Sequence, residues 1–595
     1  REREREMASK DSNEPLLDVE EARMACSSRK RGGSITFPFI LGGMMGQTLA
    51  TLGATSNIIV YLINQYNVKN IDAAQTSNIV NGCINLAPIA GAIASDSFLG
   101  CFAVVAASSL LTLLGMVLFT LTATVSSLRP APCPPGSTTC AAASARQNAV
   151  LFLAVALASM GAGGTRFVMA TMGANQLDTP RDRNVFFNWY FFVMYVAAVI
   201  GFTAVVYVQD NVGWGWGFGS CAAASAVGAV VLLLGVSRYR GDVPQGSPFV
   251  GLARVVVAAV RKWKVTPPPP PPPPSRDEAV EHYYYSCSSG GEKPKRQVPT
   301  RRLRFFNRAA VKTPGDTHPD GSVAKPWRLC TVDQVEDLKA VAGVLPLWFS
   351  SLFISISIAV VLSLSVLQAL TLDRRLSPHF AVPAGSLPVA TLASSAFSLS
   401  LLDRCLYPAC RRLLGRVPSP LQRVGAGHAI NAAALAAAAL VERRRLDVVR
   451  SRGVAASATV PMSVLWLLPP LAVVGLGEAF HFPGQVVLYY QEFPEALRGS
   501  ATGMVGAVVA VGFYASTAVV GLVRRATGWL PEDINVGRLD KVYWMLAAVG
   551  TVNFGFYLLC ATVYEYADKV ENSNTTTSST AITNNKGEPS SAMDG

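Results

Sequence analysis

Long apolar runs alternate with short polar segments along most of this chain of 595 residues. A helix needs about 20 consecutive apolar residues to cross the ~30 Å hydrocarbon core of a bilayer. Windows of about that length lie near residues 35–62, 74–95, 102–125, 148–172, 185–208, 214–236, 338–366, 386–407, 423–442, 463–490, 497–523 and 541–564. The pattern predicts an all-α membrane protein with twelve transmembrane helices.

A long polar segment, residues 237–331, separates the first six windows from the last six. It contains the proline run Pro267 to Pro274, and polyproline is stiff, extended and unable to cross lipid. The segment therefore predicts a cytoplasmic linker, a solvated spacer between six-helix bundles at 35–236 and 332–566. This layout is typical of the major-facilitator architecture, in which substrate binds near the midplane between two halves.

Both ends of the chain lack an apolar pattern. Residues 1–34 predict a cytoplasmic N-terminal segment, and residues 1–6 are left out of the fold prediction because they precede a plausible start at Met7. Residues 567–595 are rich in Asn, Ser and Thr, which predicts a disordered tail.

Composition supports the membrane assignment, because half of the residues are hydrophobic and only 15% are charged. The net charge of +13 is spread over the loops, which favours contact with the lipid bilayer over nucleic acid. Lys and Arg placement puts both termini and the linker in the cytoplasm. Three basic groups oppose this topology: Arg374 with Arg375, the run Arg443 to Arg445, and Arg524 with Arg525. We find no metal-ligand spacing, nucleophile arrangement or phosphate loop, so the sequence predicts neither an enzyme nor a cofactor.

Two cysteines, Cys133 and Cys140, fall in the predicted extracellular loop 129–147. An oxidising environment permits a disulfide between them, and two unpaired thiols are an equally favoured alternative.

Ionisable residues interrupt two apolar windows, at Arg166 and at Glu478. A charge at that depth costs roughly 2.5 to 3.5 kcal/mol on insertion scales, so each needs a partner or a polar cavity, which indicates a substrate pathway. His481 follows Glu478 by three residues and could relay a proton or only complete a hydrogen-bond network. Tyr190 and Gln485 could line the cavity, although packing explains them equally well.

Several motifs resemble the plant nitrate/peptide transporter family, the plant arm of the proton-coupled oligopeptide transporters. They include Asn78 to Gly82, Asp96 to Gly100, Phe186 to Tyr190, Gln209 to Gly217, Val335 to Lys339, Leu421 to Gly425 and Gly477 to Glu478. The resemblance covers about residues 32–566. Ile35 to Phe39, Gly163 to Phe167, Leu372 to Arg375 and Gly477 to Gly484 are most similar to its nitrate excretion branch.

The first helix departs from the family pattern. Members usually carry Glu-x-x-Glu-Arg there, implicated in proton coupling, whereas the matching positions are Met44, Gln47 and Thr48. These positions share one helix face, which has become neutral and one unit more positive than usual. The family histidine linked to nitrate falls at Ile358, so that contact does not carry over.

The resemblance implies that Arg166 stands where relatives commonly have lysine and that Glu478 pairs with it across the two halves. A guanidinium presents parallel donors that suit a trigonal oxyanion such as nitrate. We favour a breakable gate, and the alternative is a static salt bridge between the bundles.

Together these features predict a plasma-membrane transporter of nitrate, with chloride as a further small inorganic anion, although the vacuolar membrane remains an alternative. We expect low affinity, efflux and weak proton coupling. A carrier of an organic anion such as a plant hormone is the alternative within transport. A transport-dead sensor or scaffold is the alternative outside it, with regulatory proteins bound at the proline run of the linker.

Overall fold

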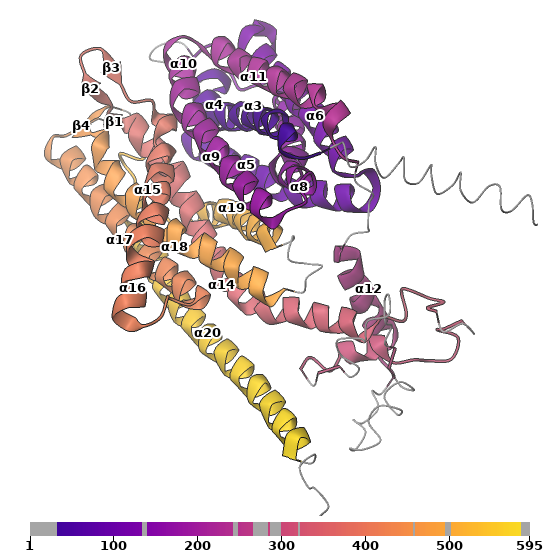
Figure 1. Ribbon diagram of the computed structural model, residues 1–595. Coiled ribbons are helices and arrows are strands. Elements are labelled where there is room, and N and C mark those ends of the chain that lie inside the picture. Colours follow the sequence, from indigo (N-terminus) through magenta and orange to yellow (C-terminus); the bar gives the residue numbers. More distant parts are fainter. Residues whose placement is uncertain are drawn as a thin grey trace, which may run out of the picture.

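The computed structural model describes residues 32–133, 140–241, 248–265, 284–285, 299–300, 302–318, 322–455, 458–493 and 501–584. Twelve of its helices are long and apolar enough to cross a membrane. The prediction of an all-α protein with twelve transmembrane helices is confirmed. Figure 1 shows the helices in two bundles, the first coloured indigo to magenta and the second red to yellow.

The N-terminal bundle holds six of the spans, several of which are interrupted by short irregular turns. Its helices are α3 (Phe37–Ser56), α4 (Ile58–Tyr66), α5 (Asn70–Ala94), α6 (Cys101–Thr124), α7 (Ala145–Gly163), α8 (Met169–Asn175), α9 (Pro180–Ile200), α10 (Val206–Asn211) and α11 (Trp214–Leu234). Glycines let the helices approach closely. An added Cβ at Gly91 of α5 would lie 2.4 Å from the carbonyl oxygen of Gly163 at the end of α7.

The C-terminal bundle holds the other six spans. Its helices are α14 (Val332–Thr371), α15 (Pro388–Leu401), α16 (Tyr407–Leu414), α17 (Pro420–Ser451), α18 (Leu468–Glu492), α19 (Ala501–Ala526) and α20 (Leu539–Asn584). Four short strands, β1 (Leu372–Asp373), β2 (Arg375–Ser377), β3 (Phe380–Ala381) and β4 (Val460–Ser463), form two two-stranded sheets, β1 with β4 and β2 with β3.

Side-chain caps set where several helices begin. The Thr331 hydroxyl accepts a hydrogen bond from the backbone N–H of Gln334, and the Gln334 side-chain oxygen accepts one from the backbone N–H of Thr331. This capping box starts α14. The pairs Ser144 with Gln147 and Ser419 with Gln422 do the same for α7 and α17. The boundary between linker and second bundle is therefore set by local chemistry.

The linker contains structure that composition did not predict. Helix α12 (Pro248–Arg261) lies in it, followed by the 3₁₀ turn η7 (Phe306–Ala310). Val255, Ala258 and Ala259 share one face of α12 and are fully buried in a small core of their own. The linker is thus partly folded, which corrects the prediction of a spacer only. The proline run lies outside the described residues.

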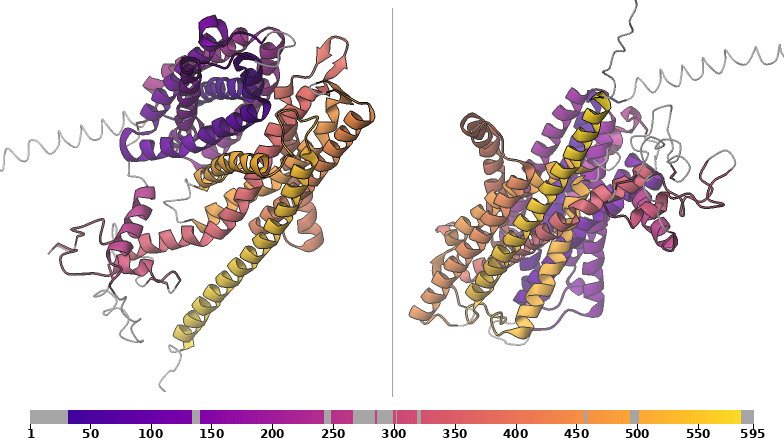
Figure 2. Two further views of the ribbon diagram at one scale, coloured as in Figure 1. Left: turned by 180° about the vertical axis from the view of Figure 1, so that it is seen from behind. Right: turned by 90° about the horizontal axis from the view of Figure 1, so that it is seen from below.

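The C-terminal tail also differs from the sequence prediction. Helix α20 continues beyond residue 567 to Asn584, and the left view in Figure 2 shows it extending past the bundle. No proline or glycine occurs after Gly555 until Gly587, so nothing in the chain breaks the helix earlier.

Candidate functional site

A cavity of about 420 Å³ lies between the two bundles. Helices of the first bundle, α3, α5, α7 and α9, face α14, α15 and α18 of the second across it. Its lining residues are Gln47, Thr48, Thr51, Leu52, Asn81, Ile84, Asn85, Ala162, Thr165, Arg166, Tyr190, Met194, Tyr195, Ala198, Phe202, Leu362, Pro388, Thr391, Leu392, Glu478 and Phe482. Most of this wall is apolar or uncharged, so the few ionisable groups decide its electrostatic character.

Arg166 provides the positive charge of the cavity. It sits in the turn η4 (Gly164–Val168), a single π-helical turn that interrupts the fourth span between α7 and α8. Its Nη1 donates to Asn85 Oδ1 at 3.1 Å, and the Tyr190 hydroxyl donates to its backbone oxygen at 2.6 Å. These contacts fix the residue within the first bundle while its side chain stays exposed to the cavity.

Glu478 provides the negative charge from the opposite bundle. It lies on α18, and its Oε2 accepts a hydrogen bond from the Ser395 hydroxyl of α15 at 3.1 Å. The two charges predicted from the sequence therefore face one cavity from different halves. Each also has a neutral hydrogen-bond partner within its own half, so the contacts of one half survive if the two halves separate.

The first-helix positions contribute no charge to the cavity. Gln47 and Thr48 line it. The Gln47 amide donates to the Ser225 carbonyl oxygen and accepts from the Ser225 hydroxyl, both at 3.0 Å, which ties α3 to α11. Met44 is buried in the core of the first bundle, where its sulfur accepts from the Thr48 hydroxyl at 3.4 Å.

His481 and Gln485 lie in the packed interior behind the cavity and are absent from its described lining. Both are buried, and the His481 ring lies 5.2 Å from that of His428 on α17. His428 in turn stacks on Tyr557 of α20 at 4.4 Å. The Gln485 amide donates to the Tyr489 hydroxyl at 2.6 Å. The sequence missed His428, although the second histidine in an apolar span was a usable signal.

Ion pairs close one end of the interface between the bundles. Lys69 contacts Glu532 at 2.5 Å, and Arg524 contacts Asp72 at 2.6 Å and Glu532 at 3.6 Å. We call these four residues the loop-end cluster, since they lie at the ends of α5 and α19 near the connecting loops. The sequence missed the cluster, although Arg524 had stood out as an exception to the charge topology.

A second buried charge network lies wholly within the C-terminal bundle. Arg445 donates to both carboxylate oxygens of Glu442, at 2.8 and 2.7 Å, and to Asn535 at 2.6 Å. Gln368 donates to Glu442 at 2.5 Å, and Arg445 also donates to Thr371 at 3.2 Å. Arg445 and Glu442 are 1% and 0% exposed, so the pair is fully enclosed.

Cys133 and Cys140 form a disulfide with a Cα–Cα distance of 5.0 Å. Among the described residues, no group of three or more His, Cys, Asp or Glu side chains could hold a metal ion.

Comparison with known proteins gives consistent matches. The model of the POT family matches residues 102–536. The chain is 46% identical over 552 residues to Protein NRT1/ PTR FAMILY 2.7 of Arabidopsis thaliana, with 92% of this chain and 96% of that protein covered. It is 46% identical over 551 residues to Protein NRT1/ PTR FAMILY 2.6 of the same plant, with the same shares covered.

Solved structures are similar in fold at low sequence identity. An auto inhibited POT family peptide transporter matches with a TM-score of 0.63 and 17% identity, covering 89% of this chain and 96% of that one. Peptide transporter POT in complex with sulfate matches with a TM-score of 0.59 and 11% identity, covering 90% and 96%.

Proposed function

This chain belongs to the POT family, within its NRT1/PTR group, and from that premise we propose that it transports nitrate, and chloride by the same contact, out of the cell across the plasma membrane. It is a multi-pass membrane transporter rather than an enzyme. Transport of a small anion, its direction and its membrane are the proposed part.

The observation that carries the proposal is the position of Arg166. Among the described residues that line the cavity it is the only cation, and Asn85 adds an amide beside it. A guanidinium keeps its proton under working conditions and offers parallel donors to a planar oxyanion. Peptide transporter POT, which shares the fold, holds sulfate in one structure, and this supports an oxyanion as ligand.

The charge pair supports alternating access. Arg166 and Glu478 face the cavity from opposite bundles, and an anion bound to Arg166 competes with Glu478 for it. The loop-end cluster ties the bundles at one end of the cavity, so this arrangement corresponds to a state closed at that end. With the linker in the cytoplasm, the loop end faces outward, so these ion pairs join the bundles on the outer side.

Weak proton coupling and efflux follow from the first helix. Gln47 and Thr48 line the cavity where relatives carry titratable carboxylates, so the usual proton entry point is missing. Without another coupled ion, the membrane potential drives the anion. An inside-negative potential favours exit of one negative charge by about 2.3 kcal/mol per 100 mV.

The second candidate substrate is an organic anion, and the size of the cavity supports it. A volume of about 420 Å³ falls in the range of sites for small organic ligands and exceeds the needs of nitrate alone. The aromatic and aliphatic walls at Tyr195, Phe202 and Phe482 could contact an apolar body while Arg166 binds its carboxylate.

Flux measurements separate these candidates. The purified full-length protein is reconstituted in vesicles, and nitrate, chloride and a carboxylate hormone are compared while potential and pH gradient are set independently. We expect potential-driven nitrate flux that persists without a pH gradient. Strict dependence of that flux on the pH gradient at zero potential contradicts uncoupled efflux, and flux of the carboxylate alone favours the second candidate. No flux of any substrate would favour a sensor or scaffold.

A further inference from the structure

The described part of the linker, which we call the linker subdomain, is folded around its own apolar core. The subdomain comprises residues 248–265, 284–285, 299–300, 302–318 and 322–331. Its core residues are Val255, Ala258, Ala259, Tyr284, Ala309, Ala310, Val311 and Cys330, which pack against Val332, Val335 and Leu338 at the start of α14. The subdomain thus sits where α14 enters its membrane-spanning stretch.

Polar contacts lock the linker subdomain to α14. Lys339 donates to the Thr300 carbonyl oxygen at 2.9 Å and contacts Glu336 at 2.7 Å, while Glu336 accepts from the Thr300 backbone and hydroxyl. Arg302 packs on Gly343, where an added Cβ would lie 2.9 Å from the guanidinium. Because α14 also contributes Leu362 to the cavity wall, the subdomain is joined to a helix of the transport site.

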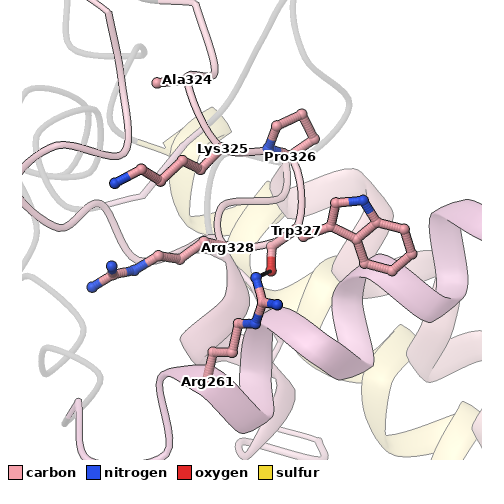
Figure 3. A pocket seen from close by; sticks show the side chains of 6 residues that line it. All are labelled: Arg261, Ala324, Lys325, Pro326, Trp327 and Arg328. Carbon is pink, nitrogen blue, oxygen red and sulfur yellow. Dashed lines mark hydrogen bonds between the residues drawn. The ribbon is translucent and has the colours of Figure 1, made fainter.

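One surface of the linker subdomain is a basic cleft of about 690 Å³. Its lining residues are Arg261, Ala324, Lys325, Pro326, Trp327 and Arg328. In Figure 3 the side chains of Lys325 and Arg328 extend in the same direction, and Arg261 from α12 points toward the backbone of Trp327. Three cations therefore gather on one small surface.

Among the described residues, the carboxylate that forms an ion pair with a residue of this cleft is Asp316. It is fully buried and also bound to Lys262 at 2.8 Å. Arg328 touches Asp316 through Nε at 3.3 Å, while its side chain remains 45% exposed. Lys325 is exposed, and no ion pair is recorded for it in the described part of the chain.

An apolar ridge lies on the same helix that supplies Arg261. Val256, Val260 and Trp263 are 40%, 55% and 62% exposed and, at spacings of four and three, share one face of α12 and its continuation. At 3.6 residues per turn, this face is rotated by roughly 110° about the helix axis from the buried one. Lys264 follows directly on the sequence and is exposed as well. An exposed apolar face with a tryptophan and flanking cations is the composition of a segment that lies in the membrane interface.

We propose that the linker subdomain binds an anionic phospholipid, with the ridge of Val256, Val260 and Trp263 in the membrane interface and the phosphorylated headgroup in the basic cleft. The apolar ridge favours a lipid over a soluble phosphate as the ligand. Only a lipid has both a phosphorylated headgroup for the cleft and an apolar environment for the ridge. Attachment of the subdomain to α14, a membrane-spanning helix, keeps both surfaces near a bilayer. Lipid binding then biases the position of α14 and so the opening of the cavity.

The test uses the full-length protein in phosphatidylcholine micelles, with binding followed by the fluorescence anisotropy of a labelled phosphatidylinositol bisphosphate. We expect Lys325→Glu to weaken binding by roughly tenfold, since basic residues near an anionic headgroup contribute strongly and locally. Arg411→Glu is the matched control, because it makes the same charge change at an exposed residue of α16 away from the cleft.

A second variant tests the ridge separately. Val260→Ser with Trp263→Ser should weaken the long-chain lipid and leave binding of soluble inositol phosphate unchanged, whereas Lys325→Glu should weaken both. Equal binding by Lys325→Glu and Arg411→Glu overturns the cleft. Full displacement of the lipid by inorganic phosphate, or no effect of the ridge variant on the lipid, overturns the lipid as ligand.

Discussion

Two arrangements of arginine and glutamate stand inside this membrane protein, and they differ in how their charges are neutralised. Arg445 and Glu442 are three residues apart on α17, are at most 1% exposed, and are joined by two hydrogen bonds. Arg166 and Glu478 belong to different bundles and face a cavity of about 420 Å³, each with a neutral partner on its own side, Asn85 or Ser395.

The difference concerns what must change during transport. A network within one bundle keeps its contacts while the bundles rock against each other. Charges on opposite walls of the central cavity change their separation as the bundles move. A charge in a span therefore indicates a role in transport when the opposite charge lies across the moving interface, and Glu442 with Arg445 marks a structural site instead.

The largest expected effect is on stability, from breaking the enclosed pair. Glu442→Ala leaves the Arg445 guanidinium buried without its carboxylate, which costs about 3 to 5 kcal/mol. We expect a marked loss of melting temperature and of folded protein recovered in detergent. Replacing both residues by methionine should recover part of that loss, because no uncompensated charge is then buried. A melting temperature unchanged in Glu442→Ala would contradict the structural assignment.

The next effect is on transport without a matching loss of stability. Arg166→Ala and Glu478→Ala should each reduce nitrate flux to background, because either change removes one side of the gate. Both side chains face the cavity, so the protein should still melt near the wild-type temperature. Normal nitrate flux in Arg166→Ala at normal membrane levels would reject the gate.

One of the two arginine–glutamate arrangements could be predicted from the sequence. Arg166 and Glu478 could be assigned to one site because an ionisable residue inside an apolar window is costly and needs a polar surrounding. Arg445 was instead counted as a loop residue, since the predicted ninth span ended at residue 442, whereas α17 continues to Ser451. Its role depends on Asn535, which is 90 positions away in the chain.

Long-range contacts explain the other omissions. Arg524 and Asp72 are separated by 452 positions, so no local pattern links them. In the linker, the proline run dominated the composition and hid the short apolar periodicity of α12. The twelve spans were predictable because hydrophobic length is a local property of the chain.

The ion pairs of the loop-end cluster do cross the interface between the bundles, and they allow a test with a smaller expected effect. Arg524 and Asp72 are 31% and 44% exposed, so the pair contributes about 1 kcal/mol or less. Arg524→Gln should therefore raise the population open at the loop end by no more than about fivefold. Distances between spin labels on α5 and α19, measured by double electron–electron resonance, report this population. Arg525→Gln is the neighbouring control, and an equal shift in both variants would exclude the ion pair as the cause.

A third buried pair, Lys262 with Asp316, lies in the linker and should give no pH effect near neutrality. Burial raises the pKa of the Asp316 carboxyl, but hydrogen bonds from Lys262 and Thr313 outweigh it and hold the pKa below its ordinary value. Its stabilisation is thus complete above about pH 4, the usual carboxyl range, and is lost only as pH falls through the lower folded value. The protection factors of the α12 backbone amides against hydrogen exchange should therefore be unchanged between pH 7 and about 5. If these protection factors fall between pH 7 and about 5 in the native protein but persist in Asp316→Asn, the pKa of Asp316 is raised rather than lowered, which would contradict the prediction.

The smallest expected effect comes from shortening Pro267 to Pro274, which lie outside the described residues. Polyproline spans roughly 3.1 Å per residue, so removing four prolines takes away at most about 12 Å of reach. The change leaves the core residues of the linker subdomain in place. Nitrate flux and surface expression should both remain at the wild-type level. Val255→Asp is the contrasting variant, because it places a carboxylate in that core and should loosen the subdomain from α14. If the shortened protein reaches the membrane normally and loses flux, the proline run is itself a working part of the transport cycle, and the folded part of the linker is not sufficient.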